Sequence, residues 1–381
     1  KLNTALIDRS RKNAKAADLA RQITANAKGQ LETLKAIRDF IAKSIRTAGP
    51  AFTELPLEEL SAADTTLADG YGHLADRAIL LHAMLTAAGF KPEFVLASEL
   101  PPLKEFTDVV KKFPQPQHFQ WPLVRVTLKG EAYYLNDTDQ YAQPGTTGHD
   151  GKLGLSLDQG RMETIHAVKD CGQRTETFCN LSLADNGRAR IRVKQCYYGT
   201  GYNGKKRYFS ELPPEERRRY FQEIVSQVSQ GARPVGDLTT RFDAYPGTEE
   251  FTVEMDHYAM VDGKYYYFNL PAQSLFPAGT DRRGLPLYMA QGSQTTGRTE
   301  INLPTGFRRM IIAPINNTLK TAGGTAKTTV AKRDAGKCVL TYELETQPAI
   351  VSPKDYPAML QAESALRQKS ARVFLFEKTG K

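Results

Sequence analysis

The stretch Leu67-Ala-Asp-Gly-Tyr-Gly-His-Leu-Ala-Asp-Arg-Ala-Ile-Leu-Leu-His-Ala-Met-Leu-Thr-Ala-Ala-Gly-Phe90 decides the fold of the first half of the chain. It predicts a tight glycine turn followed by a helix over about residues 72–88, with Gly89 as its C-terminal cap. Apolar residues occupy most of the circumference of this helix. A helix of that kind is normally buried at the centre of a domain.

The segments around this helix predict a mixed α+β half. Helices are expected over about residues 17–23 and 31–45, because apolar residues recur there at intervals of three and four. The expected strands are 94–97, 123–128 and 132–136, with a Lys- and Pro-containing insertion over residues 99–117. We therefore place a first domain at residues 1–165.

From about residue 170 the pattern changes to strands and turns. Asp185-Asn186-Gly187 predicts a hairpin turn between strands at 178–183 and 189–197. Further strands recur at regular spacing, which favours an all-β, sandwich-type domain over residues 166–381. One helix is expected to begin near Pro213 and another to cover about residues 354–369.

The stretch from residue 67 to residue 90 resembles the central motif of the bacterial transglutaminase-like family, whose fold is papain-like. In that family a glycine turn delivers a Cys to the start of a buried helix, where the helix dipole favours the thiolate. Gly72, Asp76 and Gly89 match the motif, and the Cys position falls on Leu74. Leucine offers no nucleophile, so no thioester intermediate can form there.

The other two members of the Cys-His-Asp triad that the resemblance implies are also missing. The His position falls on Trp121, whose indole cannot take up a proton at neutral pH. The Asp position falls on Asn136, in the segment Leu135-Asn136-Asp137-Thr138. An amide alone is compatible with papain-like chemistry. The three losses together predict a pseudoenzyme, in which we expect Trp121 to pack over Leu74 and fill the former active site.

The resemblance implies an exported protein of the bacterial cell envelope, periplasmic or on the cell surface. We expect a binding or scaffold protein that holds a peptide, protein or glycan in the vestigial cleft, against Tyr71, His73, Trp121 and His118. An alternative of another class is a cysteine-independent hydrolase or peptidase that uses displaced residues such as His118 and Asp137. A third interpretation makes the first half a spacer.

Composition limits the partners. The chain has 381 residues and a formal net charge of +9 that is spread along it, so a nucleic-acid partner is not expected. No apolar stretch approaches the roughly 20 residues that cross a bilayer, so we expect no transmembrane segment. The chain begins at Lys1 without a signal-peptide pattern, and we expect any targeting segment to have been lost from it.

Two motifs point away from cofactors. The six His residues show no metal-ligand spacing, and the four Cys residues do not form paired Cys-x-x-Cys units. Residues 199–206 nearly match a phosphate-binding loop, but Lys206 replaces the Ser or Thr that binds magnesium. We interpret that segment as a basic turn, and we predict neither a metal nor a cofactor.

The cysteines leave the redox state open. They are Cys171, Cys179, Cys196 and Cys338. Cys179 and Cys196 flank the expected hairpin and could face each other across it, so a disulfide is compatible with an exported protein. Buried free thiols are equally compatible with the pattern.

Overall fold

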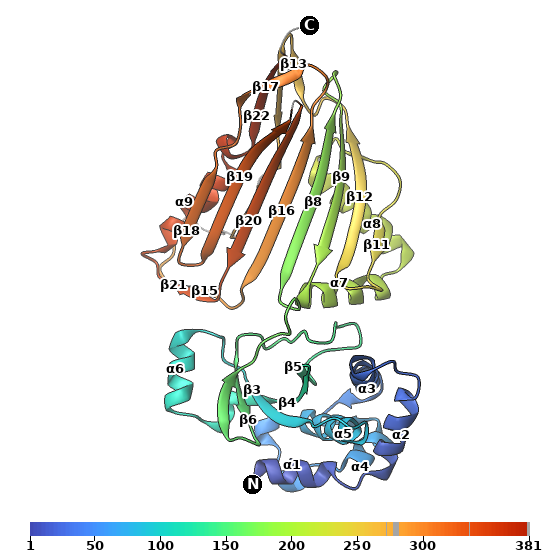
Figure 1. Cartoon of the computed structure of the whole chain (residues 1–381). Coiled ribbons are helices and arrows are strands. Elements are labelled where there is room, and N and C mark those ends of the chain that lie inside the picture. The colour runs from blue at the N-terminus through green and yellow to red at the C-terminus, as the bar shows by residue number, and fades with distance from the viewer. Residues whose placement is uncertain (272, 277–281, 335, 379–381) are drawn as a thin grey trace. The chain divides into compact units, whose positions relative to one another are not determined.

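The computed structural model describes residues 1–271, 273–276, 282–334 and 336–378. The chain forms two compact units, Lys1–Gly172 and Gln173–Lys381 (Figure 1). The sequence predicts the boundary after residue 165. The segment that follows belongs to the first unit because the Val168 amide donates to the Gly145 carbonyl and Cys171 is buried.

The first unit is built around helix α5 (Leu74–Ala87), of which most residues are buried. Four helices surround it: α1 (Leu2–Ser10), α2 (Ala14–Thr24), α3 (Gln30–Ser44) and α4 (Ala63–Asp69). A short parallel pair, β1 (Arg46–Thr47) and β2 (Tyr71–Gly72), precedes α5 at its N-terminus. The central, nearly all-apolar helix predicted from the sequence is thus confirmed. The expected insertion over residues 99–117 contains helix α6 (Lys104–Lys112).

Helix α5 packs on a five-stranded antiparallel sheet in the order β5-β4-β3-β6-β7. The strands are β3 (Glu93–Ser98), β4 (Phe119–Leu128), β5 (Glu131–Leu135), β6 (Leu153–Ser156) and β7 (Arg161–Thr164). Because side chains alternate along a strand, the sheet carries two separate cores. Phe94, Leu96 and Val124 join the main core with α5. A smaller core covers the opposite face.

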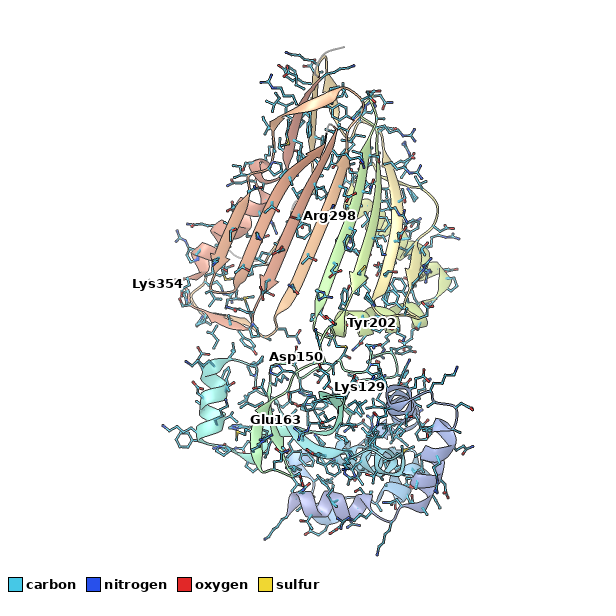
Figure 2. All side chains as sticks on the ribbon, viewed as in Figure 1. Lys129, Asp150, Glu163, Tyr202, Arg298 and Lys354 are labelled. Carbon is cyan, nitrogen blue, oxygen red and sulfur yellow. The ribbon has the colours of Figure 1, made fainter. Side chains whose placement is uncertain are left out.

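The smaller core consists of Val95, Ala97, Leu123, Tyr134 and Ile165, with Trp121 and Ala132 packed against it. Beside it, Arg125 pairs with Glu93 and with Glu163, which is labelled in Figure 2. The two carboxylates outweigh the opposing effect of burial and raise the pKa of Arg125. This ion-pair cluster crosses three strands, β3, β4 and β7, and so helps to define their register.

In the described part of the second unit, a large sheet has the strand order β10-β12-β9-β8-β16-β20-β19-β18. Strand β11 also pairs with β12. Its strands are β8 (Arg174–Leu183), β9 (Ala189–Tyr197), β10 (Arg233–Pro234), β11 (Thr239–Arg241), β12 (Gly247–Met255), β16 (Ser293–Asn302), β18 (Asn317–Thr321), β19 (Gly324–Asp334) and β20 (Lys337–Thr346). Strand β8 pairs with β16 in parallel, and the other pairs are antiparallel. Figure 1 shows the long strands lying side by side.

A second layer covers one face of this sheet. It includes the smaller sheet β13-β14-β22-β17, made of β13 (Met260–Asp262), β14 (Tyr265–Asn269), β17 (Phe307–Ile312) and β22 (Val373–Lys378). Helices α8 (Pro214–Val228) and α9 (Tyr356–Arg367) contribute Val225 and Met359 to the same core. The expectation of an all-β sandwich with one or two helices needs correction, because helices share the covering layer and the described part of the unit has a third helix, α7 (Gly199–Glu211). A minor pair, β15 (Leu287–Met289) and β21 (Ala349–Val351), completes the strands.

The predicted hairpin is confirmed, and of the two alternatives left open for the cysteines the structure shows thiols rather than a disulfide. Strands β8 and β9 are joined at the Asn-Gly turn, where Gly187 has a φ of 83°. Their register places Cys179 opposite Val193 and Cys196 opposite Glu176. All four cysteines are in the thiol form. The basic turn expected over residues 199–206 is wrong, because this segment begins helix α7. None of the described helices is long and apolar enough to span a bilayer.

Candidate functional site

The N-terminus of α5, where the resemblance places a nucleophile, is closed by a hydrogen-bonded cap. The Ala75 amide donates to Nδ1 of His73 at 3.2 Å, and the His73 amide donates to Oδ2 of Asp76 at 3.0 Å. Since Nδ1 accepts, Nε2 carries the ring proton and donates it to the Pro50 carbonyl at 2.7 Å. His73 is buried, and both of its ring nitrogens serve the domain's own structure. Leu74 itself is half-buried.

Asn136, where the resemblance places the third triad residue, is hydrogen-bonded to Leu74, where it places the first. It follows strand β5 with a φ of 86°, and its side chain is buried. Its Nδ2 donates to the Leu74 carbonyl at 3.0 Å and to the Pro122 carbonyl at 2.8 Å. The fold therefore brings these two positions together, as the resemblance implies. The amide's two protons are used to hold helix α5 against strand β4.

Trp121 lies on the opposite face of the sheet from α5. It packs against the smaller core, and its ring centroid lies 5.5 Å from that of His149. The reason is strand alternation: Trp121 stands two residues before Leu123 and pairs with Ala97, and both of these residues belong to the smaller core. The expected packing of Trp121 over Leu74 is therefore incorrect.

A polar group that the sequence analysis did not assemble lies on the loop after β5. Oδ2 of Asp137 accepts from Oγ1 of Thr147 at 2.5 Å and from the Gly148 amide at 2.9 Å. Burial raises the pKa of Asp137. Oγ1 of Thr147 in turn accepts from the His149 amide at 3.1 Å. No hydrophobic period marks this loop, so the sequence carried no signal that Thr147 and His149 would join Asp137.

This group does not form a nucleophile with its base. The Thr147 hydroxyl donates its proton to Asp137, and His149 reaches Thr147 through its backbone rather than its ring. A nucleophilic hydroxyl needs a base placed at its own proton, with a third group to orient that base. Among the described residues, no hydrogen bond or ion pair joins Asp137 to His118, the other displaced residue considered above. His118 is half-buried, and its carbonyl accepts from the Glu99 amide.

Within the described ranges of the chain, no three His, Cys, Asp or Glu side chains are grouped so that they could hold a metal ion. The described geometry at the triad positions offers helix capping and backbone hydrogen bonding.

Two buried imidazoles predict that the first unit loses stability in mild acid. The His82 ring is stacked on Phe94. Burial lowers the pKa of both His82 and His149 from 6.5 to about 4. Between these values the unfolded chain binds more protons than the folded one, so stability falls as pH drops from 6.5 towards 4, by up to about 1.4 kcal/mol per pH unit for each imidazole. Urea unfolding at several pH values measures the slope of the free energy of unfolding against pH. The fluorescence of Trp121, the single tryptophan, monitors the unfolding.

Two histidine variants test this prediction. His82→Gln is expected to make the slope shallower, whatever it does to stability at pH 7. His166→Gln, at an exposed side chain, is the matched control and is expected to keep the wild-type slope. An unchanged slope in His82→Gln would contradict the assignment.

Comparison with known proteins supports the fold and does not identify an activity. No protein-family model matches the chain, and no curated protein matches it. The chain is similar to the crystal structure of a protein from Parabacteroides distasonis that is named a "putative protease". The two share 15% sequence identity and a TM-score of 0.55 over 99% of this chain, which spans 58% of the length of that protein. The likeness shows a shared α+β fold.

Proposed function

We propose that the chain is a non-catalytic transglutaminase-like protein of the bacterial cell envelope, whose first unit binds a peptide or glycan. The observation that carries the proposal is the pair of hydrogen bonds from Asn136 to the Leu74 and Pro122 carbonyls. Triad geometry needs a thiol at the first position, an imidazole beside it and an orienting group on that imidazole. This scaffold holds a leucine, an amide bound to the backbone, and a tryptophan on the far face of the sheet.

The exposed residues beside the N-terminus of α5 support a binding role. Tyr71, at the start of β2, is 56% exposed, and it pairs in register with the exposed Arg46 of β1. An exposed aromatic ring offers a face for a sugar or an apolar side chain and a hydroxyl for hydrogen bonding. Arg46 adds donors for a carboxylate or a carbonyl. Tyr71 is thus the strongest candidate among the four binding residues expected from the sequence.

An activity assay tests the non-catalytic proposal. Amide hydrolysis and acyl transfer by the wild type are expected to stay at the background rate, with or without a thiol reagent, because Leu74 supplies no nucleophile. Leu74→Cys is the comparison; it restores the thiol but not the imidazole, and we expect it to be alkylated without gaining turnover. Wild-type turnover that a thiol reagent inhibits would overturn the proposal. Thiol-insensitive turnover lost in Asp137→Asn would instead support the hydrolase alternative.

The binding arm of the same test uses soluble glycan–peptide fragments of a bacterial cell wall and their separated sugar and peptide parts. Tyr71→Ala is expected to weaken binding about 2- to 10-fold, the amount that corresponds to an aromatic contact. Phe113→Ala is the matched control, since Phe113 is also an exposed aromatic side chain of this unit, at 60% exposure. Equal affinities of the wild type and Tyr71→Ala would remove Tyr71 from the site, and no binding of any fragment would overturn the binding role.

A further inference from the structure

The second unit contains a cavity of about 250 Å³ that the proposed function does not use. It lies between the large sheet and the layer that covers it. Strands β8, β9, β16, β19 and β20 form its floor, and α8 with the segments around Leu270 and Arg372 form its opposite wall. All of these elements belong to the same unit.

The strand register arranges the floor in two neighbouring rows. One row holds Gln195, Thr177, Tyr342 and Thr328, and the next holds Val193, Cys179, Thr299 and Leu340. In the first row Gly297 lies between Thr177 and Tyr342, and a Cβ there would come within 2.1 Å of the tyrosine ring. The glycine therefore lets Tyr342 lie flat across the sheet and form part of the floor.

Two polar side chains of the floor are hydrogen-bonded to neighbouring threonines. The Tyr342 hydroxyl is hydrogen-bonded to Thr177, and the Cys179 thiol to Thr299. Burial raises the pKa of both Tyr342 and Cys179, so both groups are neutral at pH 7. The floor thus offers a ligand apolar contact without a charge.

Arg372 supplies a charge at the edge of this apolar space. Its backbone carbonyl accepts from the Leu270 amide at 2.9 Å, and its Nη1 donates to the Leu270 carbonyl at 3.5 Å. Its Nε is buried and has no hydrogen-bond partner. Within the described residues no carboxylate pairs with this guanidinium. A buried donor on a cation is costly to leave unpaired, so the position favours an anionic oxygen.

We propose that this cavity binds a medium-chain monocarboxylate, with its alkyl chain over Val193 and Leu340 and its carboxylate on Arg372. The size agrees with this class, because a cavity of about 150 Å³ accommodates a benzene ring and this one is larger. A saturated chain of about ten carbons fits such a space, and the burial of its CH₂ groups favours binding. The inference stands independently of the role proposed for the first unit.

Isothermal titration with sodium decanoate, below its micelle-forming concentration, tests the site in the full chain. We expect saturable binding at one site. Arg372→Gln should weaken decanoate binding at least tenfold while leaving the binding of decanol, which has no charge, within twofold of the wild type. The absence of decanoate binding to the wild type would overturn the proposal, as would equal losses of both ligands in Arg372→Gln.

A second measurement on the wild type does not depend on how the variant folds. Decanoate is expected to slow the alkylation of Cys179 by N-ethylmaleimide at least fivefold, because Cys179 lines the cavity. Cys171, in the first unit, is the internal control, and its rate should not change. Peptide mapping by mass spectrometry distinguishes the two thiols. Unchanged alkylation of Cys179 at saturating decanoate would place the ligand elsewhere and contradict the proposal.

Discussion

Replacing Glu249 with alanine is expected to lower the free energy of unfolding of the second unit by about 3–5 kcal/mol, the cost of breaking a buried ion pair. Glu249 is 1% exposed, on strand β12. Its carboxylate lies 2.9 Å from Nζ of Lys205 on α7 and accepts from the Tyr220 hydroxyl of α8 at 2.6 Å. With burial as the larger cause, this carboxylate also raises the pKa of Tyr220. The Glu249 carboxylate therefore links helices α7 and α8 to strand β12.

The large effect is expected because alanine would leave Lys205 close to apolar and aromatic side chains without its counter-charge. Nζ of Lys205 lies 4.8 Å from the ring centroid of Tyr220 and 5.1 Å from that of Tyr197. These rings do not replace a carboxylate, because a cation–π contact contributes about 0.5–2 kcal/mol. Urea unfolding followed by near-ultraviolet circular dichroism of the tyrosines measures the loss.

The adjacent residue on β12 is a matched control. Glu250 points to the other face of the strand and pairs with Arg192, whose side chain is largely exposed. Surface pairs of that kind contribute about 0–1 kcal/mol, so Glu250→Ala should change stability little. The double variant Glu249→Leu/Lys205→Met should lose less free energy of unfolding than Glu249→Ala, because it removes both charges of the pair. Equal losses in Glu249→Ala and Glu250→Ala would contradict the role given to Glu249.

In the first unit, Asn136→Ala is expected to cost about 3 kcal/mol of stability. Its two hydrogen bonds to buried backbone carbonyls would be lost, at about 1 kcal/mol each. Alanine would also have to adopt the φ of 86°, which costs about 1–2 kcal/mol in a residue with a Cβ. Trp121 fluorescence in urea reports on this unit.

Two variants separate these contributions. Asn136→Gly removes the hydrogen bonds but tolerates the backbone angle, so its loss should be about 1 kcal/mol smaller than that of alanine. Asn136→Asp keeps the shape but, when ionised, turns oxygens towards the Leu74 and Pro122 carbonyls, and it should be no more stable than alanine. A loss below about 0.5 kcal/mol in Asn136→Ala would mean that the amide does not hold α5 to β4.

Local sequence patterns predicted the elements that local physics controls. The apolar run from Leu74 to Leu85 predicts a buried helix because few polar residues interrupt its circumference, and α5 is that helix. The Asn-Gly turn predicts the β8–β9 hairpin, since glycine tolerates the positive φ that such turns require. Neighbouring residues alone determine both features.

Tertiary structure decided which side chains meet. The pairing of β4 with β3 puts Trp121 on the face away from α5, together with Leu123 and Ala97. The bulge at Gln120 places Phe119 on the α5 face instead. The segment that begins at Gly199 looked like a loop, but it forms α7, whose Lys205 is held by a glutamate more than forty residues later in the chain. Asp137, Thr147 and His149 are likewise gathered by a loop that has no periodic pattern.

By itself the sequence determined that a buried helix follows the glycine turn, and that Leu74, Trp121 and Asn136 stand where the resemblance implies a triad. Only the tertiary structure showed that Asn136 binds the backbone of Leu74 while Trp121 belongs to a separate core. The physical reason is that the identity of a side chain is independent of geometry, whereas a contact depends on strand register. A register shift of one residue moves every side chain of a strand to the other face of the sheet.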